Sequence, residues 1–192
     1  MSTANDAAGL TEASWCRHAL DIRIRLAAAP YMVGWGYSVS SPRVAFESPG
    51  VPSSLVGGAR LTNCSTLTAS LLTSAFPDHP WTEREYGDLQ VFADRLPESP
   101  WSPISAAVRM GVAKSTTDFH PRRWSLVQGW RSLGANPSGH AFLAFADSDS
   151  ESLLVLEATS IDGIGPRYKT TTATALRESY PAGLYIGVLT RA

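Results

Sequence analysis

The chain has 192 residues, a net charge of −1, 44% hydrophobic residues and 17% charged residues. This length fits one globular domain with a substantial core, and the near-neutral charge argues against a nucleic-acid-binding surface. The N-terminus lacks a signal-peptide pattern, and no segment approaches the ~20 apolar residues of a membrane span. We therefore expect synthesis in the cytoplasm, export only by a signal-peptide-independent route, and no binding to membranes or nucleic acid.

The first predicted element is a helix that begins after Thr11, its N-cap, and ends before Pro30. Leu20 and Leu26 lie on the apolar face that the helical spacing predicts. Residues 34–60 follow and are rich in Gly, Ser and Pro. That composition predicts a long irregular surface segment, and long loops in compact domains are often functional.

The second predicted helix begins at the stretch "TNCSTL", where Thr62 or Asn63 supplies the N-cap. Cys64 then falls in the first helical turn, and Pro77 ends the helix. One of the chain's two cysteines therefore lies at a helix N-terminus.

Two shorter helices are predicted next. Thr82 and Glu85 have the spacing of a capping box, which begins one of them. Ser102 followed by Pro103 begins the other, which we expect to cover residues 103–113.

After about residue 121 the pattern changes to β-branched and apolar runs typical of strands. The short polar segment 147–152 is typical of a hairpin connection. Helices followed by an antiparallel sheet indicate an α+β fold, with N-terminal helices packed on a C-terminal sheet. We expect a flexible tail over residues 1–10 and a single domain over residues 11–192. The predicted strands cover residues 123–130, 140–146, 152–159 and 183–189.

Metal and cofactor motifs are missing from the sequence. The four histidines never pair at three- to five-residue spacing, and the two cysteines are far apart. Asp147, Asp149 and Glu151 alternate as in a calcium loop, but the glycine and the distant glutamate of such a loop are absent. We expect no metal and no cofactor.

Cys64 has two interpretations. A free cysteine is most often a small buried hydrophobe. A helix N-terminus, however, stabilises a thiolate through its partial positive charge and unpaired N–H groups, and the thiolate is the nucleophilic form. A nucleophile of this kind also needs a base and a group that orients the base.

His140 and Glu157 are the candidates for these two roles. His140 opens the strand 140–146, and Glu157 is a carboxylate among apolar neighbours near the end of the strand 152–159. A hairpin that turns symmetrically about residues 149 and 150 places position 157 opposite Phe142. His140 and Glu157 then become diagonal neighbours on one face, within reach of a hydrogen bond.

Other assignments of the orienting role remain open. Asp162 and Gln128 are the reserve candidates for the group that orients His140. A structural alternative pairs Glu157 with an arginine such as Arg167.

A helix cysteine, a strand histidine and a polar residue on the next strand together resemble the papain-like cysteine hydrolases. More narrowly, "APYMVGWG", "TNCSTL" and "SGHAFLAF" resemble, in this order, the motifs of the NlpC-type cell-wall peptidases. The resemblance implies a papain-like catalytic domain in which Tyr31 lies beside the nucleophile, Cys64 attacks and His140 is the base. Asn63 stands where the family has an aspartate.

The resemblance also implies a function. The expected activity is hydrolysis of an amide bond in peptidoglycan stem peptides through a Cys–His–Glu triad and an acyl-enzyme. A papain-like amidase, deamidase, isopeptidase or acyltransferase, acting on a protein or small-molecule amide, is the first alternative. The second is a non-catalytic binding module whose six tryptophans line a groove. The oligomeric state is left open by the sequence.

Overall fold

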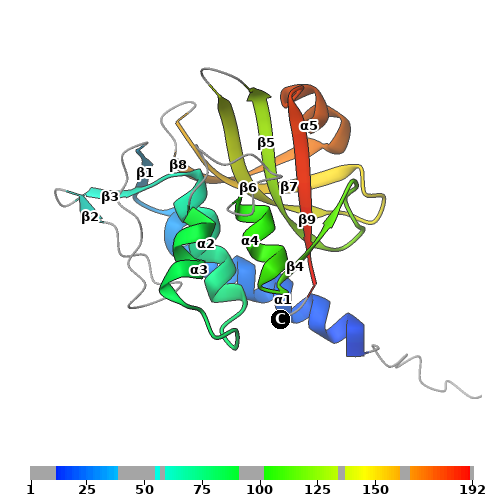
Figure 1. Ribbon diagram of the computed structural model, residues 1–192, viewed down its shortest axis with the longest axis horizontal. Coiled ribbons are helices and arrows are strands. Elements are labelled where there is room, and N and C mark those ends of the chain that lie inside the picture. The colour runs from blue at the N-terminus through cyan, green and yellow to red at the C-terminus, as the bar shows by residue number, and fades with distance from the viewer. Residues whose placement is uncertain are drawn as a thin grey trace, which may run out of the picture.

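The computed structural model describes residues 12–38, 55–56, 59–90, 102–133, 137–160 and 165–190. The predicted tail, most of the predicted irregular segment and Asp162 lie outside these described residues. Within them the protein is a mixed α+β structure built on a six-stranded antiparallel sheet (Figure 1).

Three of the predicted helix starts are confirmed by their caps, whereas Thr11, the predicted cap of the first helix, lies outside the described residues. Asn63 caps the helix that begins at Cys64, and Ser102 caps the one that begins at Pro103. The Thr82 hydroxyl accepts a hydrogen bond from the Glu85 N–H, and the Glu85 carboxylate accepts one from the Thr82 N–H. The described helices are α1 (Glu12–Ala28), the 3₁₀ turn η1 (Ala29–Met32), α2 (Cys64–Ala75), α3 (Glu83–Gln90), α4 (Pro103–Arg109) and α5 (Ala173–Ser179).

The main sheet has the strand order β4-β9-β5-β6-β7-β8, and each neighbouring pair is antiparallel. Its strands are β4 (Ala113–Thr116), β5 (Trp124–Ser132), β6 (Ser138–Ala146), β7 (Ser152–Thr159), β8 (Gly165–Thr172) and β9 (Gly183–Leu189). A second sheet has the order β1-β3-β2, from β1 (Trp35–Tyr37), β2 (Leu55–Val56) and β3 (Ala59–Thr62).

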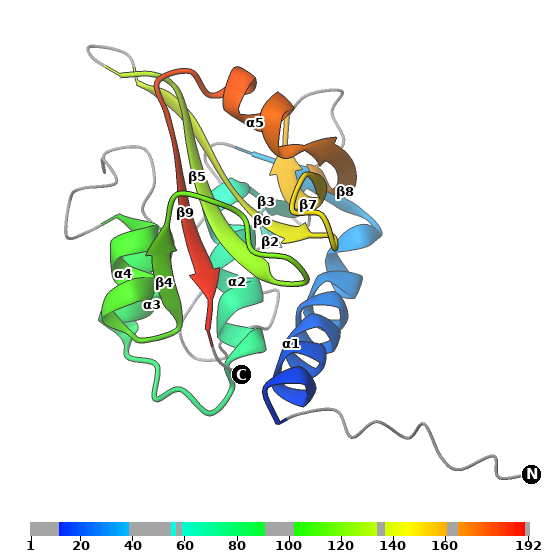
Figure 2. The ribbon, with the colours of Figure 1, turned by 90° about the vertical axis from the view of Figure 1, so that its right-hand side faces the viewer.

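The main sheet has a helical layer on each face. Leu143 and Leu156 point from the sheet into the larger core, which α1, α2 and α4 complete. Phe142 and Val155 point the other way, into a smaller core with Leu176 of α5. In Figures 1 and 2, α5 lies at the top of the view and α1 to α4 lie below it. This alternation is what two-sided burial of a sheet requires.

Three sequence predictions need correction. The helix expected over 103–113 ends at Arg109, because Gly111 adopts a positive φ of 73°, a common helix terminator, and β4 begins at Ala113. Leu26 is 68% exposed, so the buried face of α1 runs through Leu20 and Ile24 instead. The segment from 165 onward, for which no strand was predicted, forms β8 and α5.

Within the described part of the chain, no helix is both long and apolar enough to cross a bilayer. The same residues contain no cluster of three or more His, Cys, Asp or Glu side chains that could hold a metal ion.

Candidate active site

Cys64 is the first residue of α2, directly after β3. The Asn63 side-chain Oδ1 accepts hydrogen bonds from the Thr66 N–H at 2.9 Å and from the Ser65 hydroxyl at 3.1 Å. These two bonds fix the first turn and satisfy one of the N–H groups that a helix start leaves unpaired. Asn63 therefore serves the site as a helix cap that sets the position of the thiol.

The Cys64 thiol is surrounded by hydrogen-bonding groups. It is only 9% exposed, and it bonds to the His140 ring and to the backbone N–H groups of Ser65 and Ala141. The Tyr37 hydroxyl forms a further hydrogen bond with it. A hydrophobic cysteine needs none of these partners, so the surroundings favour an ionised sulfur over a packing residue.

His140 is held from its other side by a carboxylate. The ring Nε2 lies 3.1 Å from Oε2 of Glu157, and both side chains are buried. Because Nε2 faces Glu157, Nδ1 is the ring nitrogen left for Cys64. The thiol, the imidazole and the carboxylate thus form one connected line.

The pairing of β6 and β7 brings His140 and Glu157 together. Leu143 lies opposite Leu156, and Ala144 opposite Val155. Continued along the hairpin, this register places position 142 opposite position 157, as a turn centred on residues 149 and 150 predicts. His140 and Glu157 are then diagonal neighbours on one face, and their hydrogen bond confirms the contact.

Glu157 also binds Arg167, its direct partner on β8. Oε1 of Glu157 lies 2.9 Å from Nε and 2.8 Å from Nη2 of Arg167. Pairing with Arg167 had been the alternative to orienting His140, but the carboxylate does both, with one oxygen for each partner.

The charges of the three groups are set by these contacts. Burial opposes ionisation of Cys64, but the hydrogen bond and charge of His140 outweigh it and lower the pKa of the thiol from its ordinary 9. Burial also disfavours a charged His140, yet bonding to Cys64 and Glu157 raises the pKa of the ring to about 9. Against its own burial, Glu157 has its pKa lowered to about 2 by His140 and Arg167. These contacts favour a thiolate–imidazolium pair with an ionised carboxylate behind it.

The structure corrects the predicted roles of Tyr31 and Gln128. The Tyr31 ring packs in the core 4.8 Å from the ring of Trp35, and burial raises the pKa of its hydroxyl to about 12. The tyrosine that contacts Cys64 is Tyr37, six residues further on. Gln128 pairs with Ala141 in the β5–β6 ladder, which places it on the face opposite to His140. It is therefore not the group that orients the ring.

Tyr37 is the site residue that the sequence analysis missed. It reaches the thiol because β1 pairs in parallel with β3, which places Tyr37 beside Thr62, two residues before Cys64. Gly165 at the start of β8 allows this approach: its φ is +64°, and a Cβ there would lie 2.7 Å from the Trp35 carbonyl oxygen. A parallel pairing across a long connection leaves no local pattern from which it could have been predicted.

A cavity of about 140 Å³ opens beside the triad. His140, Glu157 and Tyr37 form part of its wall, so it borders two members of the connected line and the tyrosine that contacts Cys64. Its other walls come from β5, β7, β8 and the α5 region, and they include the basic residues Arg131, Arg167 and Lys169.

Comparison of the chain with protein-family models, with curated proteins and with solved structures found no match.

Proposed function

We propose that the protein is a cysteine hydrolase that cleaves an amide bond through a Cys64–His140–Glu157 triad. The observation that carries this proposal is the buried, hydrogen-bonded line of thiol, imidazole and carboxylate. Nucleophile, base and orienting group within mutual reach are the signature of covalent acyl transfer.

The reaction divides between the three side chains. The Cys64 thiolate attacks the amide carbonyl carbon, and the new C–S bond pushes one electron pair onto the carbonyl oxygen. The N-terminal turn of α2 offers positive charge to that oxyanion. His140 then donates the proton on Nδ1 to the leaving nitrogen as the C–N bond breaks, which leaves a thioester on Cys64.

The second half of the reaction restores the enzyme. His140, now neutral, accepts a proton from a water molecule, whose oxygen attacks the thioester. The C–S bond breaks, the carboxylic acid leaves and the Cys64 thiolate re-forms beside the imidazolium. Glu157 keeps the ring in place throughout and stabilises its charge.

The same geometry supports a papain-like fold of the NlpC type. A cysteine at a helix start, a histidine on a sheet strand and a carboxylate on the neighbouring strand occur here in that order. With this resemblance we propose a peptide amide in peptidoglycan stem peptides as the substrate.

The proposal is tested by incubating the protein with purified cell-wall fragments and measuring the release of new amines. Cys64→Ala should abolish release and leave the melting temperature nearly unchanged, whereas Cys16→Ala, on α1, should retain full activity. A large loss of melting temperature in Cys64→Ala would mark Cys64 as a core residue. Release from protein or small-molecule amides alone would move the substrate to the amidase or acyltransferase class. Thiol labelling no faster than in the unfolded chain would favour a binding module.

A further inference from the structure

The cavity beside the triad carries an excess of positive charge. Among its described lining residues, Arg131, Arg167 and Lys169 are basic, and Glu157 is the one carboxylate. Glu157 already binds both Arg167 and His140. Two cations, Arg131 and Lys169, are therefore left to face the open space.

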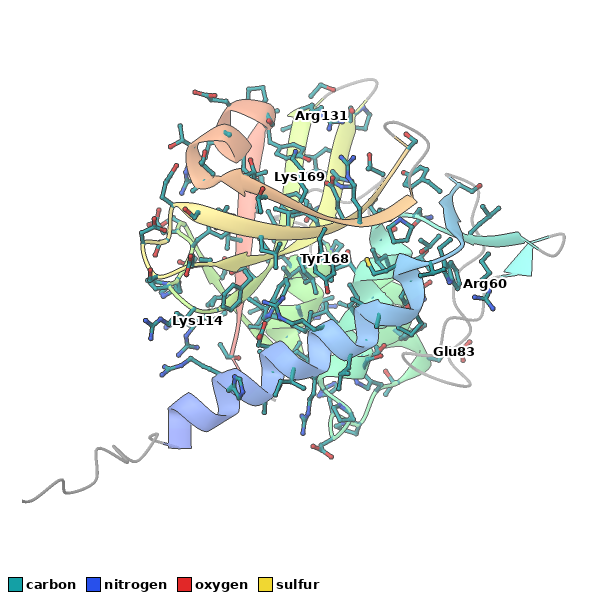
Figure 3. The ribbon with its side chains drawn as sticks, turned by 180° about the vertical axis from the view of Figure 1, so that it is seen from behind. Arg60, Glu83, Lys114, Arg131, Tyr168 and Lys169 are labelled. Carbon is teal, nitrogen blue, oxygen red and sulfur yellow. The ribbon has the colours of Figure 1, made fainter. Side chains whose placement is uncertain are left out.

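Arg131 and Lys169 have no acidic partner in the part of the chain that the structure describes. The Arg131 guanidinium lies 5.3 Å from the centre of the Tyr180 ring, which holds it at the cavity wall. Lys169 pairs with Val155 in the β7–β8 ladder and shares its face of the sheet. Figure 3 shows Arg131 and Lys169 at the same end of the molecule, on strands that flank β6 and β7 from opposite sides.

The size of the cavity limits what it can take. A volume of about 140 Å³ is room for several water molecules. That space fits a carboxylate on a short stem. Arginine binds carboxylates with its planar fork and lysine adds a point charge, so the two basic residues match such a group.

We propose that this cavity binds a carboxylate that the substrate carries next to the amide to be cleaved, and that Arg131 and Lys169 select for it. The inference rests on the proposed function, because the cavity matters to substrate choice only if Cys64 attacks the substrate. Amide substrates of peptide type carry their negative charge as carboxylates. The group is either an acidic side chain or a free terminal carboxylate.

Two alkylating reagents of similar size test the charge preference. Iodoacetate and iodoacetamide both react when the thiolate sulfur displaces iodide, which forms a C–S bond and releases I⁻; only iodoacetate carries a carboxylate. In a Cys16→Ala background Cys64 is the one remaining thiol. The measurement is the ratio of the two rate constants, iodoacetate over iodoacetamide.

We expect the double variant Arg131→Gln/Lys169→Gln to lower this ratio about tenfold, while the rate with iodoacetamide stays unchanged. High salt should lower the ratio in the parent protein as well, because ions screen exposed charges. Lys114→Gln is the matched control: Lys114 is an exposed lysine on β4, at the sheet edge away from β8 (Figure 3). Its ratio should equal that of the parent.

Matched peptide amides then identify the source of the carboxylate. One pair differs only by Glu against Gln beside the scissile amide, and a second pair differs only by a free against an amidated C-terminus. The carboxylate of one pair should lower KM about tenfold, and the double variant should lose this preference.

The outcomes separate the two proposals. Cys64 that is unreactive with both reagents would defeat the proposed function and this inference with it. Reactive Cys64 with the same reagent ratio in the parent and the double variant would overturn the inference alone. A preference for acidic peptides that survives in the double variant would also overturn the inference alone.

Discussion

At the scale of single residues, the Glu157 carboxylate contacts two neighbours that have different roles. Oε2 contacts the His140 ring, as the proposed chemistry requires, and Oε1 holds Arg167, which ties β7 to β8. A residue with both contacts should affect rate and stability when it is changed. Separating the two effects requires measuring both.

Glu157→Gln keeps the size of the side chain and one hydrogen-bond acceptor but loses the charge that stabilises the imidazolium. We expect kcat to fall by up to ~10²–10⁴-fold. Glu157→Ala should lower kcat further, because the ring also loses its tether, and should lower the free energy of unfolding by about 3–5 kcal/mol. Enzyme kinetics and urea unfolding on the same samples measure both.

Glu178→Gln, which removes an exposed carboxylate on α5, is the control for charge loss and should leave both quantities unchanged. Folded Glu157→Ala with normal turnover would contradict the triad as described. The orienting role would then pass to Asp162, since Gln128 lies on the other face of the sheet.

The ion pair also predicts how the reactivity of Cys64 depends on pH. The pKa of Cys64 lies below its ordinary 9, so the alkylation rate of the folded protein should rise at a lower pH than that of an ordinary thiol. A second change in the rate is expected near pH 9, where His140 loses its proton. In urea, the alkylation rate of the same thiol should be low at neutral pH and should rise as an ordinary thiol titrates. Stopped-flow alkylation of the Cys16→Ala protein tests this; identical folded and unfolded profiles would exclude the ion pair.

At the scale of elements, local signals predicted well and distant pairings did not. The Asn63 cap, the Thr82–Glu85 box and the hairpin over 147–152 each depend on residues close in sequence, and the structure confirms them. The hairpin register alone was enough to bring His140 to Glu157. Tyr37 depends instead on a parallel pairing of β1 with β3, so no local pattern revealed it.

β8 was not predicted as a strand from the sequence. Pro166 near its start argues against a central strand, and prolines are confined to edges and strand starts. β8 is indeed an edge strand of the main sheet. Of its basic residues, Arg167 was named from the sequence as a possible partner of Glu157, whereas Lys169 joined the site only once the sheet order was known.

Gly129 on β5 is required by the ring that covers it. A Cβ at this position would lie 2.5 Å from Cγ of Tyr180, and that ring is already stacked on Phe142 with centroids 5.9 Å apart. We expect Gly129→Ala to lower the free energy of unfolding by about 1–3 kcal/mol, through overpacking. Gly187→Ala on β9 is the matched control, since its Cβ would meet Ala113 at an ordinary 3.4 Å. Urea unfolding of both variants measures the effect. If Gly129→Ala is as stable as the parent protein, the Tyr180 ring moves aside and the expected overpacking is wrong.

At the scale of the whole molecule, the charged site contributes to stability in a pH-dependent way. The pKa of Glu157 is about 2 in the folded protein and ordinarily 4.5, so the unfolded chain binds this proton first as acid is added. The stabilisation is therefore complete above about pH 4.5 and is lost as the pH falls toward 2. The free energy of unfolding should drop between pH 5 and pH 3 by less in Glu157→Gln than in the parent or in Glu178→Gln. Equal drops in all three proteins would contradict the lowered pKa.

The position of β9 has a consequence for synthesis. This strand, residues 183–189, comes late in the chain yet lies between β4 and β5 in the sheet. A ribosome adds residues from the N-terminus onward, so β5 lacks this neighbour until β9 has been synthesised. His140 lies on β6, which pairs with β5. During synthesis, the sheet that carries His140 is therefore complete only once β9 has emerged.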